Sequence, residues 1–579
     1  MQFRRTLTWA AGLGLLAFAA GCGEDGPTEP TAPPVPTNLA VTQLSLTSVR
    51  VSWTASTGAD RYVLERASAA QPGVFTAVGG SITGTSFDDT GLTAGTAYSY
   101  RVAAAAGTAV SGYAAPVSIT TGLKAATVQA NITASRTFYK DTVYTLKGFI
   151  KVTNGATLTI QAGTKIVGDL ATPGSSLWIL RGAKIDAQGT AAEPIVFTSA
   201  NAPGNRKPGD WGGIIIIGNG IINRTGTPIN TEGGSAGVAE NYAGGNDNAD
   251  NSGTLRYVRI EFAGYDISNG AGQELNALSM YAVGSGTRIE YIQTMSGLDD
   301  SFEWWGGAVD TRYLVSYESG DDHFDWTEGY AGRNQFLIAL QTQRLVPASG
   351  AGSFSSDPRG FEADGCDPAP NSGCTVTTTT TSTPYSRPVF ANFTLVGPGQ
   401  LGGFPADGNG IVLRRATAGI LTNGIVARWP GVGFQVRDAF TDSLRLRDSL
   451  TVANMVLAEN GPLAAQTHYD ADGLDINPAN ESSRRYGQAA KYAARNHRTG
   501  TQAAALFTSL NPAGLDWTPK TTGGQPDPTT GGGTIVPTTL NARVAGYPYS
   551  GGWATTTYVG AAAPTGAKWW DGWTVYLIN

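Results

Sequence analysis

Polar and apolar residues alternate between about positions 37 and 121, in short runs that turn-forming residues separate. The runs VRVSW (49–53), RYVLER (61–66) and YSYRVAA (98–104) follow this alternation most clearly. A period of two is typical of strands that bury one face and expose the other. This part of the chain therefore predicts a β-sandwich of its own.

A different pattern begins after Leu123 and continues through most of the remaining chain. Short apolar runs such as ATLTIQAGTKIVG (156–168) each end in a turn signal, and a helical period is hard to find. The segment LDDSFEWW (298–305) recurs as GDDHFDWT (320–327), displaced by 22 residues. One coil of a right-handed parallel β-helix takes about that many residues, so we expect an all-β chain with these segments on adjacent coils.

Strand alternation assigns faces within this repeat. If Phe302 and Phe324 stack inside the helix, Trp304 and Trp326 share their parity and also point inward. The opposite parity is expected to face solvent and comprises Asp299, Ser301, Glu303, Trp305, Asp321, His323 and Asp325. Asp300 and Asp322 have the inward parity, or else lie in the turn before each strand.

The acidic residues of the repeat form the strongest candidate for chemistry. Stacked carboxylates repel one another unless water, a cation or a basic partner separates them, and calcium prefers such hard oxygen ligands. The candidate calcium ligands are Asp299, Asp300, Glu303, Asp321, Asp322 and Asp325. The alternatives are a solvated acidic face and a catalytic carboxylate cluster.

Composition agrees with this picture and excludes one class of partner. The chain has 579 residues, enough for two or three domains, and only 15% of them are charged. Its formal net charge of -6 comes without a basic stripe or an Arg-rich tail. Nucleic acid is therefore a poor candidate partner.

The first 22 residues have the features of an export signal. Arg4 and Arg5 precede an apolar stretch that ends at Cys22, too short to span a bilayer. The ending Ala-Ala-Gly-Cys resembles a bacterial lipobox, although Leu is commoner where Ala19 stands. We expect Cys22 to be acylated, residues 23–36 to form a Pro-rich tether, and the protein to reach the outer membrane or cell surface. The alternative is an ordinary secreted protein.

The other two cysteines lie close together. Seven residues, DPAPNSG, separate Cys366 from Cys374, and their Pro and Gly favour a tight loop that a disulfide can close after export. Two free thiols are the alternative. The pair falls in a stretch near 345–388 that predicts a loop insertion in the β-helix. The three histidines are scattered and no CxxC is present, so a Cys/His zinc site is not expected.

Residues 37–121 resemble a fibronectin type III domain. The positions that carry the resemblance are Pro36, Leu39, Trp53, Tyr62, Leu92, Gly95, Tyr98 and Tyr100. The resemblance implies that Trp53 fills the core between the sheets, and that GLTAGTAYSYRV forms the corner before the penultimate strand. In bacterial surface proteins such a module is more often a spacer than a binding site.

The remainder, 125–579, resembles β-helix surface lipoproteins of Bacteroidetes and related bacteria, a largely uncharacterised group with a pectate-lyase-like fold. The resemblance is carried by Trp211 to Ile217, by Asp299 to Gly307 and by the Trp-rich C-terminal segment. We expect Trp569, Trp570 and Trp573 to cover the last coil. The alternative role for Trp305, Trp569 and Trp570 is stacking on a sugar.

Two functions follow from these expectations. The first is a lipid-anchored binding or scaffold protein that presents a β-helix face to a glycan or protein partner. The second is a calcium-dependent polysaccharide lyase or glycoside hydrolase acting on acidic glycans. For the lyase, Asp299, Glu303, Asp321 and Asp325 would hold calcium. The proton-abstracting base would be one of Arg256, Arg259, Arg288 and Arg312.

Overall fold

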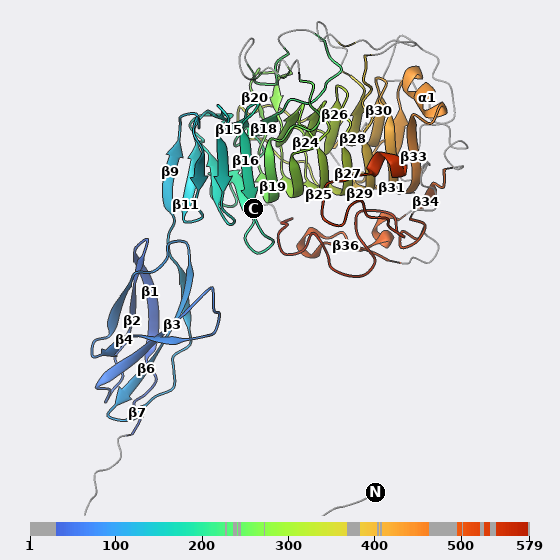
Figure 1. Ribbon diagram of the computed structural model, residues 1–579. Coiled ribbons are helices and arrows are strands. Elements are labelled where there is room, and N and C mark those ends of the chain that lie inside the picture. The colour runs from blue at the N-terminus through green and yellow to red at the C-terminus, as the bar shows by residue number, and fades with distance from the viewer. Residues whose placement is uncertain are drawn as a thin grey trace, which may run out of the picture. The chain divides into compact units, whose positions relative to one another are not determined.

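The chain forms two compact units, Met1–Leu123 and Lys124–Asn579, in a computed structural model (Figure 1). The structure describes residues 31–225, 229–234, 240, 242, 245–270, 272–366, 374, 382–401, 404–405, 408–462, 495–500, 502–520, 526–532 and 540–576. The predicted signal peptide, Cys22 and the tether up to residue 30 lie outside these residues. Among the described residues, no helix is long and apolar enough to cross a membrane.

The first unit is the predicted sandwich. One sheet contains β1 (Thr37–Ser45), β2 (Ser48–Thr54) and β5 (Ser86–Thr90). The other contains β3 (Arg61–Ser68), β4 (Thr76–Ile82), β6 (Ala97–Ala106), β7 (Ala109–Val110) and β8 (Val117–Thr120). Trp53 is buried in the core between the sheets, and the Tyr98 hydroxyl accepts a hydrogen bond from the Thr93 amide at 3.0 Å. The expected core tryptophan and tyrosine corner are confirmed.

The second unit winds as a parallel β-helix with two principal sheets. The short sheet has nine strands, in the order β12 (Phe149–Val152), β15 (Ser176–Ile179), β18 (Gly213–Ile217), β22 (Leu278–Tyr281), β24 (Phe302–Trp305), β26 (Phe324–Thr327), β28 (Arg359–Asp364), β30 (Asn409–Arg414) and β32 (Phe434–Val436). Phe302 pairs with Phe324 and Trp304 with Trp326 in parallel register. The two Asp-Asp segments therefore lie one rung apart, as predicted.

The long sheet has fifteen strands. Its main path runs through β9 (Lys124–Val128), β11 (Thr142–Leu146), β14 (Lys165–Gly168), β17 (Ile195–Ser199), β19 (Gly253–Glu261), β23 (Arg288–Met295), β25 (Asp310–Tyr317), β27 (Arg333–Leu340), β29 (Val389–Val396), β31 (Gly419–Ala427), β33 (Leu450–Ala458) and β34 (Arg498–Gly500). The strands β10 (Arg136–Phe138), β13 (Thr157–Ile160) and β16 (Lys184–Gln188) form a branch that joins at β19.

The core between the sheets is apolar and strongly aromatic. The rings of Phe302 and Phe324 stack with centroids 5.3 Å apart, and Trp304 and Trp326 are fully buried beside them. The inward parity expected for these four residues is confirmed. Aromatic stacking between rungs adds to burial in fixing the register, because a shift by one residue would turn the rings outward.

Each long-sheet strand from β19 to β33 bends at one non-glycine residue with positive φ. The bend residues are Tyr257, Tyr291, Tyr313, Phe336, Asn392, Asn423 and Asn454, with φ between 49° and 65°. The aromatic members stack outside the helix, with centroids 4.3 Å apart for Tyr257 and Tyr291. Asparagine tolerates this left-handed conformation, and stacking on neighbouring rungs compensates the strain at the aromatic positions.

The C-terminal strap, residues 540–576, packs along the outside of the long sheet. The Trp573 ring meets Tyr257 and Tyr291 edge-on, and Gln293 exchanges two hydrogen bonds with the Val575 backbone. Trp569 and Trp570 belong to the same apolar cluster against this sheet. The expectation that the tryptophans cover the last coil is therefore wrong, because aromatic bend residues on the flank of the helix offer them an apolar surface.

Short elements complete the fold. They are the hairpin β20 (Tyr265–Asp266) and β21 (Glu274–Leu275), the helix α1 (Ala439–Leu446), the turns η2 (Ala503–Leu506) and η3 (Pro512–Gly514), the hairpin β35 (Phe507–Ser509) and β36 (Asp516–Pro519), and α3 (Leu540–Val544). Asp438 caps α1 by accepting a hydrogen bond from the Thr441 amide.

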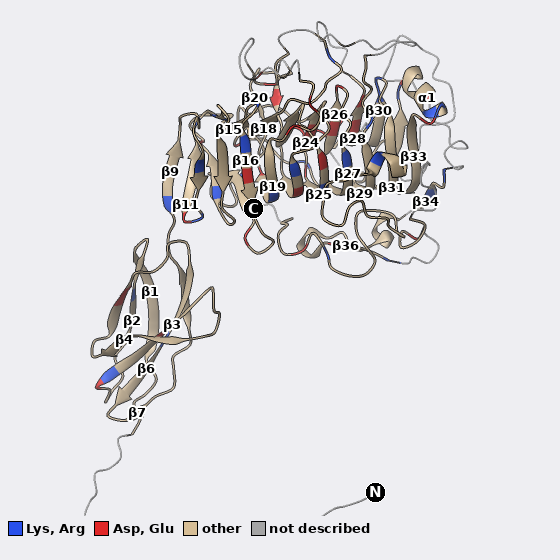
Figure 2. Ribbon diagram, viewed as in Figure 1, with Lys and Arg blue, Asp and Glu red and all other residues tan. Residues whose placement is uncertain are grey.

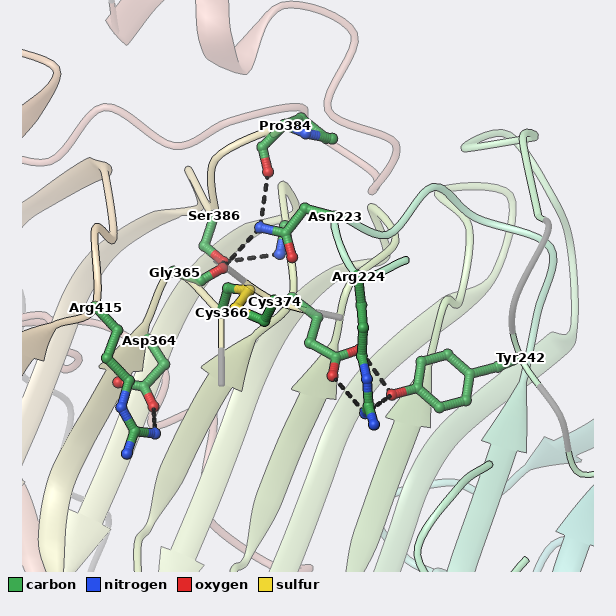
Figure 3. The surroundings of a disulfide bond; sticks show 12 residues. Asn223, Arg224, Tyr242, Asp364, Gly365, Cys366, Cys374, Pro384, Ser386 and Arg415 are labelled. Atoms are coloured by element: carbon green, nitrogen blue, oxygen red, sulfur yellow. Dashed lines mark hydrogen bonds and ion pairs between the residues drawn. A yellow bond between two sulfur atoms is a disulfide. The ribbon is translucent and has the colours of Figure 1, made fainter. Parts of the chain in front are cut away.

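The expected insertion near 345–388 is not one continuous excursion. The strand β28 lies within it as a full rung of the short sheet, with loops before and after it. The second loop contains the predicted Cys366–Cys374 disulfide, beside Asn223, whose amide donates to the carbonyls of Gly365 and Pro384 (Figure 3). The bridge closes the loop directly after β28.

Candidate functional site

A ladder of side chains lies in the turn before each short-sheet strand. The Asn276 side-chain oxygen accepts from the Asp300 amide at 3.0 Å, and Asp300 Oδ1 accepts from the Asp322 amide at 2.8 Å. Asp322 Oδ1 in turn accepts from the Arg359 amide at 2.5 Å. Asp300 and Asp322 therefore lie in the turn, the second of their two expected positions, and one oxygen of each is used to join successive rungs.

A second ladder follows the outward face of the strands themselves. Glu303 on β24 pairs in register with Asp325 on β26, which pairs with Glu362 on β28. Neighbouring strands lie about 4.8 Å apart, so three carboxylates are stacked on consecutive rungs. Like charges in that arrangement destabilise a sheet unless something neutralises them.

The two ladders meet in an acidic cavity of about 190 Å³. Its lining consists of Glu232, Glu274, Asn276, Asp299, Asp300, Glu303, Trp305, Asp321, Asp322, Asp325, Thr327, Glu362, Asp364 and Arg415. Figure 2 shows Asp and Glu gathered around β24, β26 and β28. All six predicted calcium ligands line this cavity, with ten carboxylates in the described lining against a single guanidinium.

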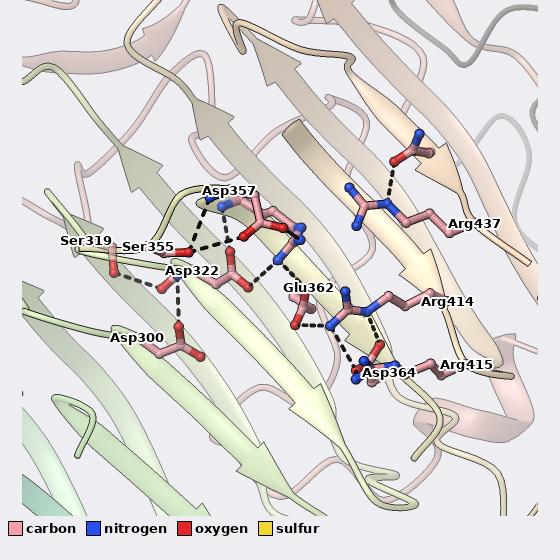
Figure 4. Close-up of polar contacts among 12 residues, drawn as sticks. Asp300, Ser319, Asp322, Ser355, Asp357, Glu362, Asp364, Arg414, Arg415 and Arg437 are labelled. Atoms are coloured by element: carbon pink, nitrogen blue, oxygen red, sulfur yellow. Dashed lines mark hydrogen bonds and ion pairs between the residues drawn. The ribbon is translucent and has the colours of Figure 1, made fainter. Parts of the chain in front are cut away.

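The arginines labelled in Figure 4 all lie on the same side of Asp300 and Asp322. Arg414 Nε lies 2.7 Å from Asp364 and its Nη2 lies 2.6 Å from Glu362. Arg415 Nη1 lies 2.7 Å from Asp364, and Arg359 contacts Asp322 and Glu362. The carboxylates on β28 are thus neutralised, whereas those on β24 and β26 face mainly one another.

The pKa directions follow this uneven distribution of charge. Burial first, and then neighbouring carboxylates, raise the pKa values of Asp300, Glu303 and Asp325 well above the usual range. Burial raises the pKa of Asp321 to about 7, although Arg359 opposes the shift. Burial acts in the same direction on Asp364, but Arg414 and Arg415 outweigh it and lower that pKa. The raised pKa values of Glu303 and Asp325 therefore favour the protonated carboxyls, and a bound cation would compete with these protons.

The donor set fits a hard divalent cation. Asp300, Glu303 and Asp325 each place a carboxylate oxygen within 4.8 Å of the others, as do Asp299, Asp300 and Asp321. Asp325 is only 9% exposed, yet its Oδ1 has no hydrogen-bond partner among the described residues, and neither does the buried Oδ1 of Asp321. An unpaired buried carboxylate oxygen is costly, and coordination of calcium would satisfy it.

Other predicted positions are distributed differently. His323 is 1% exposed and its Nδ1 lies 2.5 Å from the Ser316 hydroxyl, so its expected exposure to solvent is wrong. Ser301 is buried in the same polar network, because the turn curls inward before the strand begins. Trp305 lines the cavity and stacks on Tyr281. Trp570, which belongs to the C-terminal strap, is 4% exposed, so little of its ring surface is available to a sugar.

The arginines expected to act as a base lie elsewhere. Arg256, Arg259, Arg288 and Arg312 are on long-sheet strands, whereas the acidic cavity lies on the short sheet. Arg256 and Arg312 both pair with Glu290, and Arg259 pairs with Glu261. The expectation was wrong because each coil contributes to more than one sheet, so closeness in sequence did not imply a shared face.

Several lining residues were missed. Glu232 lies in a loop and Glu274 in the short hairpin strand β21, and the 22-residue repeat predicts the position of neither. Glu362 had a usable signal, because Phe361-Glu362 repeats the apolar-acidic pair of Phe302-Glu303 and Phe324-Asp325. The loop before β28 makes the spacing between the second and third copies longer than 22 residues, so the third copy was not recognised as part of the repeat.

Comparisons with known proteins agree with this architecture. The profile of the pectate-lyase-like β-helix domain family matches residues 130–506, and that of the fibronectin type III domain matches residues 34–120. Exoglucanase B of Cellulomonas fimi is 45% identical over 129 residues, which cover 21% of this chain and 11% of that protein. The chain thus spans about a tenth of the length of this curated relative.

Solved structures match a small part of the chain. An Fn3-like protein from Clostridium thermocellum is 30% identical, with 15% of this chain and 92% of that one covered and a TM-score of 0.14. Titin kinase with its flanking domains is 23% identical, with 15% and 16% covered and a TM-score of 0.14. Since the β-helix profile matches well over half of the sequence, the chain belongs to the pectate-lyase-like β-helix domain family and carries a fibronectin type III domain before the β-helix.

Proposed function

We propose that this protein is a lipid-anchored cell-surface protein that binds acidic glycans through calcium held in the acidic cavity. The observation that carries the proposal is Oδ1 of Asp325, which has no hydrogen-bond partner in the described part of the chain and is buried among stacked carboxylates that outnumber the nearby positive charges. Calcium would neutralise this surplus and leave coordination positions for the carboxylate of a sugar. The fibronectin type III domain would serve as a spacer between the anchor and the β-helix.

Calcium binding is tested by calorimetry on the purified protein. Asp325→Asn keeps the shape of the side chain but removes one charged ligand, so we expect at least a tenfold loss of calcium affinity. Asp448→Asn is the matched control, because Asp448 is an exposed carboxylate outside the cavity. Absence of heat, and no change in melting temperature with calcium, would remove the metal from the proposal.

Glycan binding is tested with polygalacturonate and alginate, each with calcium and with a chelator. We expect binding that requires calcium and is weakened by Asp325→Asn but not by Asp448→Asn. A neutral polysaccharide is the control ligand. Equal retention of the neutral and acidic polymers would contradict recognition of the carboxylate.

The anchor is tested separately. Wild-type protein expressed in a bacterium with lipoprotein-processing enzymes should incorporate labelled fatty acid and appear in the membrane fraction. Cys22→Ser should lose both the label and the membrane association. Release of the wild-type protein into the medium without label would favour the ordinary secreted form.

A lyase is the second candidate, because Arg415 shares the cavity with the carboxylates. A lyase needs a base that can accept a proton, but Arg415 is ion-paired with Asp364. Although burial alone would lower the pKa values of Arg359 and Arg414, nearby carboxylates outweigh it and raise them. These features favour binding over elimination. Unsaturated product from polygalacturonate or alginate, abolished by Asp299→Ala and Asp321→Ala, would establish the lyase instead.

A glycoside hydrolase would use the same cavity in another way. It needs one protonated and one ionised carboxyl, and the raised pKa of Glu303, caused first by burial, supplies a candidate acid. New reducing ends without unsaturated product, lost in Glu303→Gln, would identify this reaction.

A further inference from the structure

The outward face of the short sheet changes sign along the rungs. Asp364 on β28 pairs in register with Arg414 on β30. On the next rung Leu413 pairs with Val436, which places Arg437 opposite Arg414. Figure 4 shows Arg437 beside Arg414, on the side of Glu362 that faces away from Asp300.

Arg437 differs from the arginines nearest to it in how its charge is balanced. Its side chain is largely buried, at 9% exposure, and its Nε donates to Gln435 Oε1 at 2.7 Å. Among the residues that the structure describes, no carboxylate forms an ion pair with it. Arg359 and Arg414, by contrast, are both paired with carboxylates.

The surroundings make this unpaired charge unfavourable. Burial first, and then the positive charges of Arg359 and Arg414, lower the pKa of Arg437. Glu362 and Asp357 attract it, but Glu362 is already shared by Arg359 and Arg414, and Asp357 is paired with Arg359. A buried guanidinium without a counter-ion is costly, and an anion would relieve the cost.

The guanidinium group of Arg437 favours a carboxylate as the bound anion. Nε is committed to Gln435, and a guanidinium fork binds a planar carboxylate well. Arg437 lies on the second rung beyond Glu362, a separation of about 10 Å along the helix axis at strand spacing. An acidic glycan running across the strands would carry one carboxylate over the cavity and a later one at this position.

We propose that Arg437 is an anion-binding subsite that takes the carboxylate of an acidic sugar, on a glycan chain whose other carboxylate is held through the cation in the acidic cavity. This inference rests on the proposed glycan-binding function and adds the direction of the chain, which crosses the rungs from β24 toward β32. Arg437 thereby selects for an acidic sugar at a defined place.

The test compares Arg437→Gln with Arg447→Gln, which removes the same charge from an exposed arginine on the same stretch of chain. Calorimetry with trigalacturonate and calcium should show at least a tenfold weaker interaction for Arg437→Gln only. Calcium affinity should be unchanged in both variants. Arg437→Lys, which keeps the charge without the fork, should recover only part of the binding.

A second measurement separates this inference from the proposed function. Monomeric sodium galacturonate, compared with sodium chloride at equal ionic strength and without calcium, should raise the melting temperature of wild type and of Arg447→Gln but not of Arg437→Gln. A galacturonate shift that depends on Arg437, without any trigalacturonate binding, would support the subsite and overturn the proposed function.

The remaining outcomes also decide the matter. If trigalacturonate binds to wild type and Arg437→Gln equally, the subsite is overturned and the proposed function stands. If wild type neither binds trigalacturonate nor responds to galacturonate, both are overturned.

Discussion

The outward faces of the two sheets differ in how their charged side chains are paired. On the long sheet, Glu290 is shared by Arg256 and Arg312, and Asp310 pairs with Arg333. On the short sheet, Glu303 and Asp325 are stacked on one another while the nearest arginines pair with carboxylates further along. Matched charges thus join successive rungs of the long sheet, whereas the short sheet has a local surplus of negative charge, where we propose that a cation binds.

The faces also differ in what covers them. The C-terminal strap closes over the aromatic bend residues of the long sheet and hydrogen-bonds to their backbone neighbours, with Tyr549 donating to the carbonyls of Ile289 and Asp310. The short sheet keeps an open cavity. We therefore assign stability to the long-sheet face and propose ligand binding for the other.

The strap offers the strongest way to break this contrast. Trp573→Ala removes a ring that is 1% exposed and packed on Tyr257 and Tyr291, and we expect it to lower the free energy of unfolding by about 4 kcal/mol. Denaturant unfolding measures this loss, with Val346→Ala, at a 70% exposed site, as control. Calcium affinity should not change. An unaltered unfolding midpoint would show that the strap is dispensable.

Charge removal should have opposite signs on the two faces. Asp310→Asn leaves the Arg333 guanidinium without its carboxylate, so we expect a loss of about 3 kcal/mol in unfolding free energy. Asp325→Asn relieves repulsion from Glu303 and Glu362, and should stabilise the calcium-free protein slightly. Unfolding in the presence of a chelator measures both, and two losses of similar size would contradict the contrast.

The pH dependence of stability sharpens the comparison further. The pKa of Asp321 is about 7 in the folded protein against 3.8 for an ordinary aspartate, so the folded state binds more protons between these values. Stability without calcium should therefore fall by about 3 kcal/mol as pH rises from about 4 to about 7. Melting temperatures measured with a chelator across this range should show the fall.

Two controls accompany the pH measurement. Asp321→Asn should reduce the fall, and saturating calcium should largely remove it because the cation takes the place of the protons. Stability that rises with pH under chelation would contradict the assignment of surplus carboxylates to this face.

The smallest effect is expected at the edge of the long-sheet network. Arg256 is 39% exposed and shares Glu290 with the better buried Arg312, so Arg256→Gln should cost about 0.5 kcal/mol or less. Thermal unfolding at low and high salt measures it, and the difference should shrink at high salt. A loss as large as that of Asp310→Asn would show that exposed pairs also support the coil.

Much of the candidate site was readable because strand geometry is periodic. The 22-residue repeat fixed Phe302 on Phe324, and parity then put Glu303 and Asp325 outside. Glu362 was not predicted, because a loop between β26 and β28 makes the spacing longer than 22 residues. In the structure, β28 nevertheless pairs with β26 in the same register. The burial of His323 was not predicted, because this residue lies in a turn, where side chains do not alternate between two faces as they do in a strand.

The sequence by itself determined that the chain is all-β, that a sandwich precedes a solenoid, and that two acidic segments lie on adjacent rungs. These follow from local alternation and a repeat length, which require no knowledge of distant contacts. Only the tertiary structure decided which arginines reach the carboxylates, where the strap lies, and that Arg437 has no described carboxylate partner. Such pairings depend on how loops of unequal length return to each sheet, and a linear pattern contains no information on that.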